Sequence, residues 1–197
     1  MGTIKEFYGK SPVDHRAIFV ETGTGHGDSL RYISKYPFNL IYSIDIDPLC
    51  INSMSKEFSN DHRVNLIEGK SEEVLPNICR KHPEPILFWL DAHFPGSYST
   101  GEVDDRERDL NIRLPLEIEL GIISSCRDAS DDIILIDDLR IYEDGDFESG
   151  NWDSRVPLGG NGVDFIYELF SETHIITKSY RNHGYIELVP NNYRGCM

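Results

Sequence analysis

Three acidic residues and one histidine follow two apolar runs, and their side chains are of types that do chemistry. The segments read Trp89-Leu90-Asp91-Ala92-His93 and Ile136-Asp137-Asp138. If the apolar runs are neighbouring parallel strands, the side chains of Asp91, His93, Asp137 and Asp138 converge at one edge of the sheet. Clustered carboxylates repel one another unless a cation lies among them. We therefore expect Asp91, Asp137 and Asp138 to bind a hard divalent cation, Mg²⁺ or Mn²⁺. The alternative is that these acids only cap a turn and a helix.

His93 is a candidate general base, because an imidazole titrates near the pH at which most enzymes work. A histidine beside an acid is also often just hydrogen-bonded to it, and the sequence leaves both interpretations open. The other histidines, among them His26 in a glycine-rich segment, show no spacing typical of metal ligands.

A glycine-rich turn predicts a nucleotide-type cofactor site. The segment IFVETGTGHGDSL covers residues 18–30, and IYSIDIDP follows from residue 41. A dinucleotide-binding turn has glycine at its first, third and sixth positions. Counted from Gly23 the sixth position is Asp28, and counted from Gly25 it is Leu30. An aspartate there would repel a phosphate and is better interpreted as a helix N-cap. The turn therefore suits a phosphate-free ligand such as S-adenosylmethionine.

Each part of that cofactor has a candidate partner. Glu21 can accept from the ammonium group, and Asp45 can bind both ribose hydroxyls. Asp45 could instead cap the next helix, a role that Asp47 could also fill. Ser71 follows a third strand at the corner beside the adenine, although it could be a plain N-cap. The residues expected to contact the cofactor are Glu21, Gly23, Thr24, Gly25, Ser29, Asp45, Ser71 and Asp91.

Alternating apolar runs and helix-length segments predict the elements that position these residues. The expected strands are 17–21, 40–45, 64–68, 85–90, 133–136, 174–180 and 185–189. The expected helices are 29–35, 48–58, 71–81, 116–126 and 162–170. This pattern predicts a single α/β domain over residues 1–197: a Rossmann-like, doubly wound, mostly parallel seven-stranded sheet with helices on both faces. The closing hairpin, with its turn at 181–184, predicts one antiparallel strand at an edge.

Two long polar segments, 94–114 and 140–162, interrupt this alternation. Both follow strand ends, where ligands bind in open α/β sheets. We expect them to form the sides of a substrate pocket, and the alternative is a pair of surface insertions. Their aromatic residues could stack on a sugar ring or pack the loops themselves. These aromatics are Phe94, Tyr98, Tyr142 and Trp152.

Composition narrows the classes of partner. The net charge of −15 argues against nucleic acid, which requires a basic surface. There is no apolar run of membrane-spanning length and no signal-peptide pattern, so a cytoplasmic protein without a membrane partner is expected. The four cysteines form no Cys-x-x-Cys pair, which favours free thiols.

The sequence resembles the class I S-adenosylmethionine-dependent methyltransferases over nearly its whole length. The motifs that carry the resemblance are FVETGTGHGDSL, IYSIDIDP, LIEGKSEEVLP, FWLDAHFPG and ILIDDLRIY. The LDAH and IDD motifs look like those of small metal-dependent sugar O-methyltransferases of the macrocin type. The resemblance implies cofactor contacts at Glu21, Gly23, Gly25 and Asp45, and metal ligation by Asp91, Asp137 and Asp138. It also implies that Asp91 or His93 removes the proton of the acceptor hydroxyl.

The expected activity is therefore metal-dependent methylation of a sugar hydroxyl in a glycan or glycosylated metabolite. A catechol or another small molecule is an alternative acceptor, and a non-catalytic S-adenosylmethionine-binding module is an alternative class. A nicotinamide-dependent oxidoreductase is disfavoured by Asp28 at the third-glycine position. A homodimer is left open.

Overall fold

The computed structural model describes residues 4, 17–93, 114–152 and 162–193, and contains one seven-stranded sheet. The strand order is β3-β2-β1-β4-β5-β7-β6, and all pairings are parallel except the two made by β7. The strands are β1 (Ile18–Thr22), β2 (Leu40–Asp45), β3 (Val64–Glu68), β4 (Ile86–Leu90), β5 (Ile133–Ile136), β6 (His174–Ser179) and β7 (Tyr185–Pro190). The expected Rossmann-like, mostly parallel α/β fold is confirmed.

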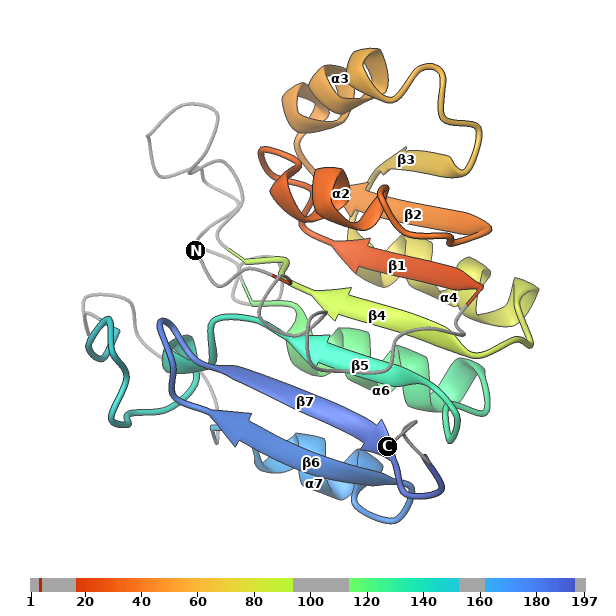
Figure 1. Ribbon diagram of the computed structural model, residues 1–197. Helices are drawn as coiled ribbons and strands as arrows, with labels where there is room; N and C mark the ends of the chain where they lie inside the picture. The colour runs from red at the N-terminus through yellow and green to blue at the C-terminus, as the bar shows by residue number, and fades with distance from the viewer. Residues whose placement is uncertain (1–3, 5–16, 94–113, 153–161, 194–197) are drawn as a thin grey trace.

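Helices cover both faces of this sheet (Figure 1). One face carries α2 (Asp28–Ile33) and α3 (Pro48–Glu57). The other face carries α4 (Ser71–Lys81), α6 (Leu116–Cys126) and α7 (Asp164–Phe170). A short 3₁₀ turn, η2 (Leu139–Ile141), follows β5 and is not predicted by the sequence pattern. The parallel strands β1, β2, β3, β4 and β5 end at the same edge, which is where ligands bind in sheets of this kind.

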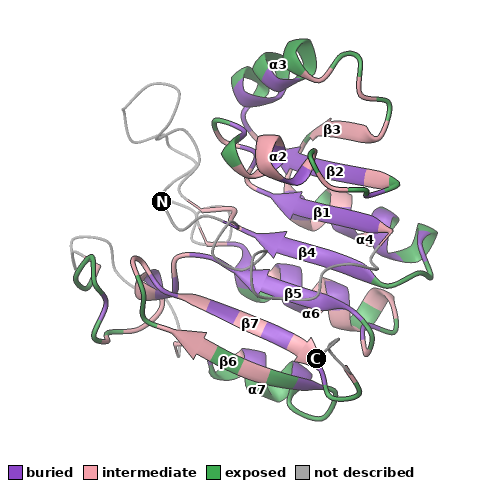
Figure 2. Cartoon of the chain, viewed as in Figure 1, coloured by how far each residue is buried: buried purple, intermediate pink, exposed green. Residues whose placement is uncertain are grey.

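The central strands are apolar on both sides because both of their faces are covered (Figure 2). Every residue of β1, β4 and β5 is buried. Successive residues of a strand point into the two hydrophobic cores on opposite faces of the sheet. Val20 and Phe88 pack in the core under α4, α6 and α7. Phe19 and Trp89 pack in the core under α2 and α3. This alternation also fixes the side to which the polar residues at the strand ends point.

The structure corrects two details of the sequence-based expectations. The antiparallel strand is β7, which lies between β5 and β6, so the edge strand is β6 and not the antiparallel strand itself. Asp28 is the first residue of α2 and not its N-cap, which is Gly27 with φ 77° and no side-chain cap bond. A glycine in the left-handed region ends the turn, so the Asp28 carboxylate is free to pair with Arg31 at 3.4 Å.

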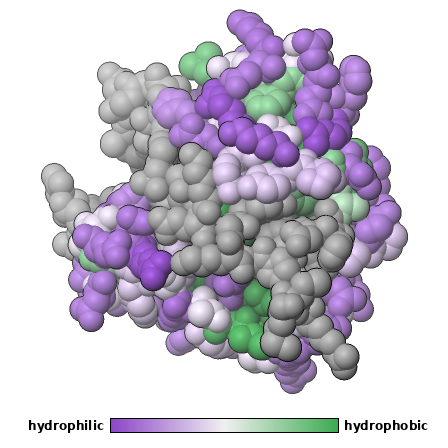
Figure 3. All heavy atoms as spheres, viewed as in Figure 1, coloured by the Kyte–Doolittle hydropathy of each residue, from purple (hydrophilic) through white to green (hydrophobic). Residues whose placement is uncertain are grey.

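The described surface is mostly hydrophilic in the view of Figure 3, with apolar residues among polar ones. Large apolar side chains that are exposed include Leu49 on α3, Tyr167 and Leu169 on α7, and Ile175 on β6. None of the helices in the described part of the chain combines the length and apolar character needed to cross a bilayer.

Candidate functional site

The glycine-rich turn lies directly against the end of β4. Gly23 has φ +83°, a conformation that favours glycine, and its backbone N–H donates to the carbonyl of Ile44 at 2.8 Å. A Cβ atom placed on Gly23 would lie 2.5 Å from the backbone oxygen of Asp91. Only glycine allows the turn to approach Asp91 so closely. The expected cofactor turn and the acidic residues after β4 therefore belong to one site.

Glu21 is completely buried at the end of β1 and holds two serine side chains. Ser29 Oγ donates to Oε2 at 2.5 Å, and Ser43 Oγ donates to Oε1 at 2.5 Å. Thr24 Oγ1 lies 2.6 Å from Ser43 Oγ, which extends the network into the glycine turn. Burial raises the pKa of Glu21 to about 7; the hydrogen bonds from Ser29 and Ser43 partly offset this rise, and the charge of Asp45 adds a smaller one. An ammonium group beside this carboxylate would favour its charged form.

Asp45 and Asp47 take different roles at the end of β2. Asp45 accepts from the backbone N–H of Gly25 at 2.9 Å through Oδ2, and from that of Asp47 at 2.8 Å through Oδ1. Asp47 is the N-cap of α3 and accepts from the N–H of Leu49 at 2.8 Å. The capping role that the sequence left open for Asp45 is therefore filled by Asp47. The half-buried Asp45 holds the glycine turn and stays beside it, where a ribose is expected.

The corner between β3 and α4 contributes Ser71, which is the first residue of α4 and is buried. The N-cap of α4 is Lys70, so Ser71 is not a plain N-cap. The Ser71 hydroxyl instead approaches the carboxyl of Glu119 on α6, where burial raises the pKa of this carboxyl and the hydroxyl partly offsets the rise. Glu119 was not expected from the sequence, where it reads as one acid of an ordinary amphipathic helix.

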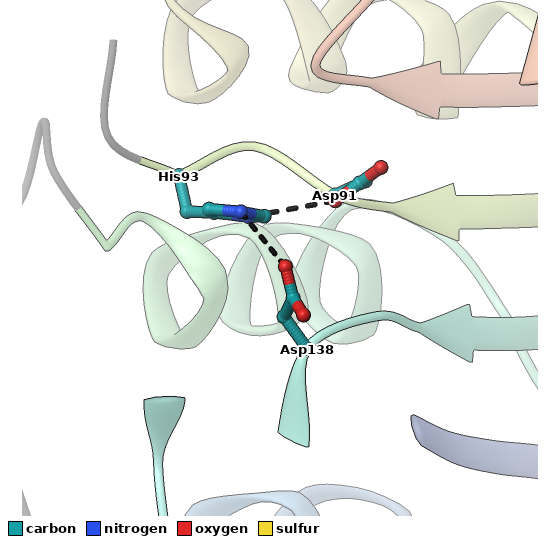
Figure 4. A group of neighbouring side chains, drawn as sticks. All are labelled: Asp91, His93 and Asp138. Atoms are coloured by element: carbon teal, nitrogen blue, oxygen red, sulfur yellow. Dashed lines mark ion pairs between the residues drawn. The ribbon is translucent and has the colours of Figure 1, made fainter. Parts of the chain in front are cut away.

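Asp91, His93 and Asp138 form a compact cluster at the ends of β4 and β5 (Figure 4). The imidazole of His93 lies between the two carboxylates, with Nδ1 at 3.4 Å from Oδ1 of Asp91 and Nε2 at 3.0 Å from Oδ2 of Asp138. One ligand atom from each of the three residues lies within 4.8 Å of the others. The predicted convergence of these side chains at one edge of the sheet is therefore seen in the structure.

The charges in this cluster perturb one another. Burial raises the pKa of Asp91, and repulsion by Asp137 raises it further. Burial lowers the pKa of His93, but the hydrogen bond and charge of Asp138 and the charge of Asp91 outweigh this and raise it to about 9. For Asp138, burial alone would raise the pKa. The hydrogen bond and the charge of His93 outweigh this effect, so the pKa of Asp138 is lowered. Without a further cation, an imidazolium between two carboxylates is the stable arrangement.

Asp137 is not a member of this compact group. It is 5% exposed, and its Oδ1 accepts from the backbone N–H of Asp138 at 2.9 Å. Burial and the neighbouring Asp138 charge raise the pKa of Asp137 to about 7. Asp137 is near enough to Asp91 to raise its pKa, and its expected part in metal binding stays a prediction.

A second histidine, His183, reaches the cluster from the turn between β6 and β7. The backbone N–H groups of Leu139 and Arg140 donate to the carbonyls of Gly184 and His183 at 3.0 and 3.1 Å. These bonds place Nδ1 of His183 3.0 Å from Oδ1 of Asp138. The sequence gives no local signal for this contact, because it depends on the pairing of β5 with β7.

The described part of the second long loop packs on itself beside the cluster. The Arg140 guanidinium lies 5.1 Å from the centre of the Trp152 ring, and its Nε lies 4.0 Å from Oδ1 of Asp138. Tyr142 packs against the core. Phe94, Tyr98 and nearly all of the first loop lie outside the described residues, so the expectation that segment 94–114 binds substrate stays a prediction.

Solved structures share this fold at low sequence identity. A protein from Staphylococcus aureus, provisionally identified as a caffeoyl-CoA O-methyltransferase, aligns with a TM-score of 0.59 and 12% identity over 95% of this chain and 90% of that chain. A provisionally identified methyltransferase from Streptococcus mutans, in complex with SAH, aligns with a TM-score of 0.60 and 13% identity over 93% and 94%. An rRNA methylase from Streptococcus thermophilus aligns with a TM-score of 0.51 and 14% identity over 90% and 88%.

No protein-family model matches the sequence, and no match to a curated protein was found. The structural matches, together with the strand order, show that the chain has the fold of class I S-adenosylmethionine-dependent methyltransferases. Because the similar structures carry descriptions as different as caffeoyl-CoA and rRNA methylation, the fold does not select an acceptor.

Proposed function

We propose that this protein is an S-adenosylmethionine-dependent O-methyltransferase whose acceptor is a sugar hydroxyl. The observation that carries the proposal is the close approach of the glycine turn to Asp91, which belongs to one group with His93 and Asp138. A cofactor bound at the turn would then lie next to this group. Methyl transfer from a sulfonium is an in-line displacement, so the enzyme mainly has to align the acceptor oxygen and accept its proton.

On this proposal, Glu21 binds the cofactor ammonium, and the glycine turn binds its carboxylate through backbone N–H groups. Asp45 binds the ribose. The buried Ser43 and Thr24 hydroxyls and the half-buried Ser29 hydroxyl hold Glu21 and the turn in position. These residues come from the stretch that begins with β1 and from β2, and their shared hydrogen bonds form the site before any ligand binds.

The cluster also fits a divalent cation. It offers two carboxylates and one imidazole, a donor set that suits Mn²⁺ and, less closely, Mg²⁺. A bound cation would lower the pKa of an acceptor hydroxyl. Asp91 and Asp138 would supply oxygen ligands. His93 is placed either to bind the ion or to take the acceptor proton, and Asp91 is the second candidate for the base.

A hydroxyl acceptor is favoured because both a cation and a base help an alkyl hydroxyl more than an amine, which is nucleophilic when neutral. A sugar also offers vicinal hydroxyls that can reach one ion together. A catechol has the same feature and is the second candidate acceptor, supported by the caffeoyl-CoA O-methyltransferase among the similar structures.

The activity can be tested by incubating the protein with methyl-labelled S-adenosylmethionine and a panel of glycosides, catechols and caffeoyl thioesters. Mass spectrometry would then identify any methylated product. We expect product with glycosides, and its loss in His93→Gln and Asp91→Asn. Transfer only to catechols or caffeoyl thioesters would contradict the sugar assignment, and cofactor binding without any transfer would favour a binding module.

The metal role needs a separate test. We expect transfer to stop in excess chelator and to return with Mn²⁺ or Mg²⁺, and full activity in chelator would contradict metal dependence. Calorimetry with Mn²⁺ distinguishes the two roles of His93. If His93 is a ligand, His93→Gln weakens Mn²⁺ binding; if it is only the base, Mn²⁺ affinity is kept while the rate falls. His62→Gln, outside the cluster, is the control.

A further inference from the structure

A buried carboxyl on α6 is not explained by the fold or by the cluster around His93. Glu119 is 1% exposed and lies among the apolar residues Leu116, Leu120 and Ile123 of the same helix. Its Oε1 makes no well-formed hydrogen bond, although the hydroxyls of Ser71 and Thr22 lie near enough to the carboxyl to lower its pKa. A buried carboxylate oxygen without a well-formed hydrogen bond destabilises the folded state, so it indicates a place that a ligand or water completes.

The surroundings of Glu119 place it at the expected cofactor site. Burial raises the pKa of its carboxyl to about 7, and the approaching hydroxyls of Ser71 and Thr22 only partly offset this. Thr22 is the last residue of β1, directly before the glycine turn, and Ser71 opens α4 after β3. His93 is also close enough to affect the carboxyl electrostatically. Glu119 therefore lies between the turn, the corner at Ser71 and the cluster.

The side of the sheet to which each acid points separates their roles. Successive residues of a strand point to opposite faces, so the Glu21 carboxylate lies on the α2 side and the Thr22 hydroxyl on the side of α4 and α6. Glu119 is thus on the opposite face from Glu21, which is the expected ammonium partner. Asp45 stands at the end of β2 and is the expected ribose partner.

With the ammonium group assigned to Glu21 and the ribose hydroxyls to Asp45, the cofactor has one more hydrogen-bond donor, the exocyclic amino group of its adenine. We propose that Glu119 accepts a hydrogen bond from this amino group and so selects adenine over 6-oxo purines. This inference rests on the proposed binding of S-adenosylmethionine. The carboxylate oxygen of Glu119 and the hydroxyl oxygen of Thr22 can both accept, which fits an amino group with two N–H donors. A 6-oxo group would instead set a carbonyl oxygen against the carboxylate.

Two cofactor analogues test this directly. S-adenosyl-L-homocysteine and S-inosyl-L-homocysteine differ in the purine, at position 6 and in the protonation of N1. We expect the unmodified protein to bind the adenosyl compound at least about 100-fold more tightly in calorimetry, as sites built to pair a polar group reject analogues that lack it. In Glu119→Gln, the amide can donate to the 6-oxo group, so this ratio should fall at least about tenfold.

Control variants make the test specific. Glu117→Gln changes an exposed glutamate on the same helix and should leave the ratio unchanged. Glu119→Ala, which removes the acceptor, should weaken only the adenosyl compound. Circular dichroism checks that the variants fold, and removing a buried charge should not lower the melting temperature of Glu119→Gln.

The outcomes separate the two proposals. Tight adenosyl binding with an unchanged ratio in folded Glu119→Gln would overturn the role of Glu119 and leave the proposed function standing. Failure of the unmodified protein to bind S-adenosyl-L-homocysteine would overturn the proposed function, and the role of Glu119 with it.

Discussion

At the scale of single residues, the site is built from carboxylates in four different situations. Glu21 is buried with two hydroxyl donors, and Asp45 is half-buried with two backbone donors. Asp138 is paired with two imidazoles, and Glu119 keeps an oxygen without a well-formed hydrogen bond. Because the cost of a buried charge depends on the donors around it, the same functional group serves different roles at these positions.

Substitutions of Asp45, the last residue of β2, and of Asp47, the N-cap of α3, should affect cofactor binding and stability separately. Asp45→Asn keeps the shape of the side chain but weakens charge-assisted bonds, so we expect S-adenosyl-L-homocysteine to bind about 1–3 kcal/mol less tightly by calorimetry. Asp47→Ala removes the N-cap of α3 and should lower the free energy of unfolding by about 1 kcal/mol, with little change in affinity. The reverse pattern would show that the ribose is held by Asp47.

Glu21 should make stability depend on pH. Its carboxyl has a pKa of about 7 in the folded state against an ordinary value of 4.5, so the folded state binds the proton more tightly. The stability that this proton contributes is present below pH 4.5 and is lost as the pH rises through 7. Glu21→Gln removes the effect. Relative to the unmodified protein, the variant should gain on the order of 2 kcal/mol between pH 5 and pH 8.

Urea unfolding of both cofactor-free proteins at the two pH values measures this gain. The comparison separates Glu21 from Asp137 and Glu119, whose raised pKa values affect both proteins alike. The pKa of Asp91 changes only through the charge of Glu21, which is the smallest of its causes. An equal difference between the two proteins at pH 5 and pH 8 would show that Glu21 titrates normally. The same variant should bind S-adenosyl-L-homocysteine more weakly, because it loses the carboxylate that we propose as the partner of the ammonium group.

At the scale of elements, parallel strands bring separate segments together by ending at one edge. The turn after β1 packs on the end of β4, and the loop after β5 is bonded to the turn between β6 and β7. The second contact is possible because β7 runs antiparallel beside β5 and directs its preceding turn to the same edge. The hairpin therefore contributes a side chain, His183, as well as completing the sheet.

The close approach of the turn to β4 should not tolerate a side chain at residue 23. Gly23→Ala would place a methyl group 2.5 Å from the Asp91 backbone oxygen and would impose an unfavourable backbone conformation, φ +83°. We expect loss of cofactor binding and a lower melting temperature. The control is Gly121→Ala in α6, where the new methyl group meets no atom within 4 Å. That variant should gain up to about 1 kcal/mol of helix stability and keep its affinity.

At the scale of the whole molecule, charge is the property most relevant to partners. The net charge of −15 opposes the phosphate contacts that nucleic-acid binding needs, although an rRNA methylase is among the similar structures. We expect no measurable binding of single-stranded or duplex RNA at physiological salt by fluorescence anisotropy. Micromolar binding that weakens steeply with salt would contradict this and would point to a basic patch.

Several features could be predicted from the sequence because they depend on short-range patterns. Apolar periodicity determined the strands and helices to within about two residues, and the bounds of β2, β3, α4, α6 and β5 agree with the prediction. The spacing of Gly23, Gly25 and Asp45 indicated the turn and its partner, which are joined by a hydrogen bond of 2.9 Å. The convergence of Asp91 and Asp138 follows from parallel strands ending at one edge.

Only the tertiary structure decided which side chains complete the site. His93 lies between Asp91 and Asp138, while Asp137 turns to a backbone N–H, because strand alternation and the left-handed conformation of Asp138 set their directions. His183 and Glu119 enter from a hairpin and a helix far away in the sequence. Such contacts depend on strand order and helix packing between distant segments, and no local pattern of residues encodes them.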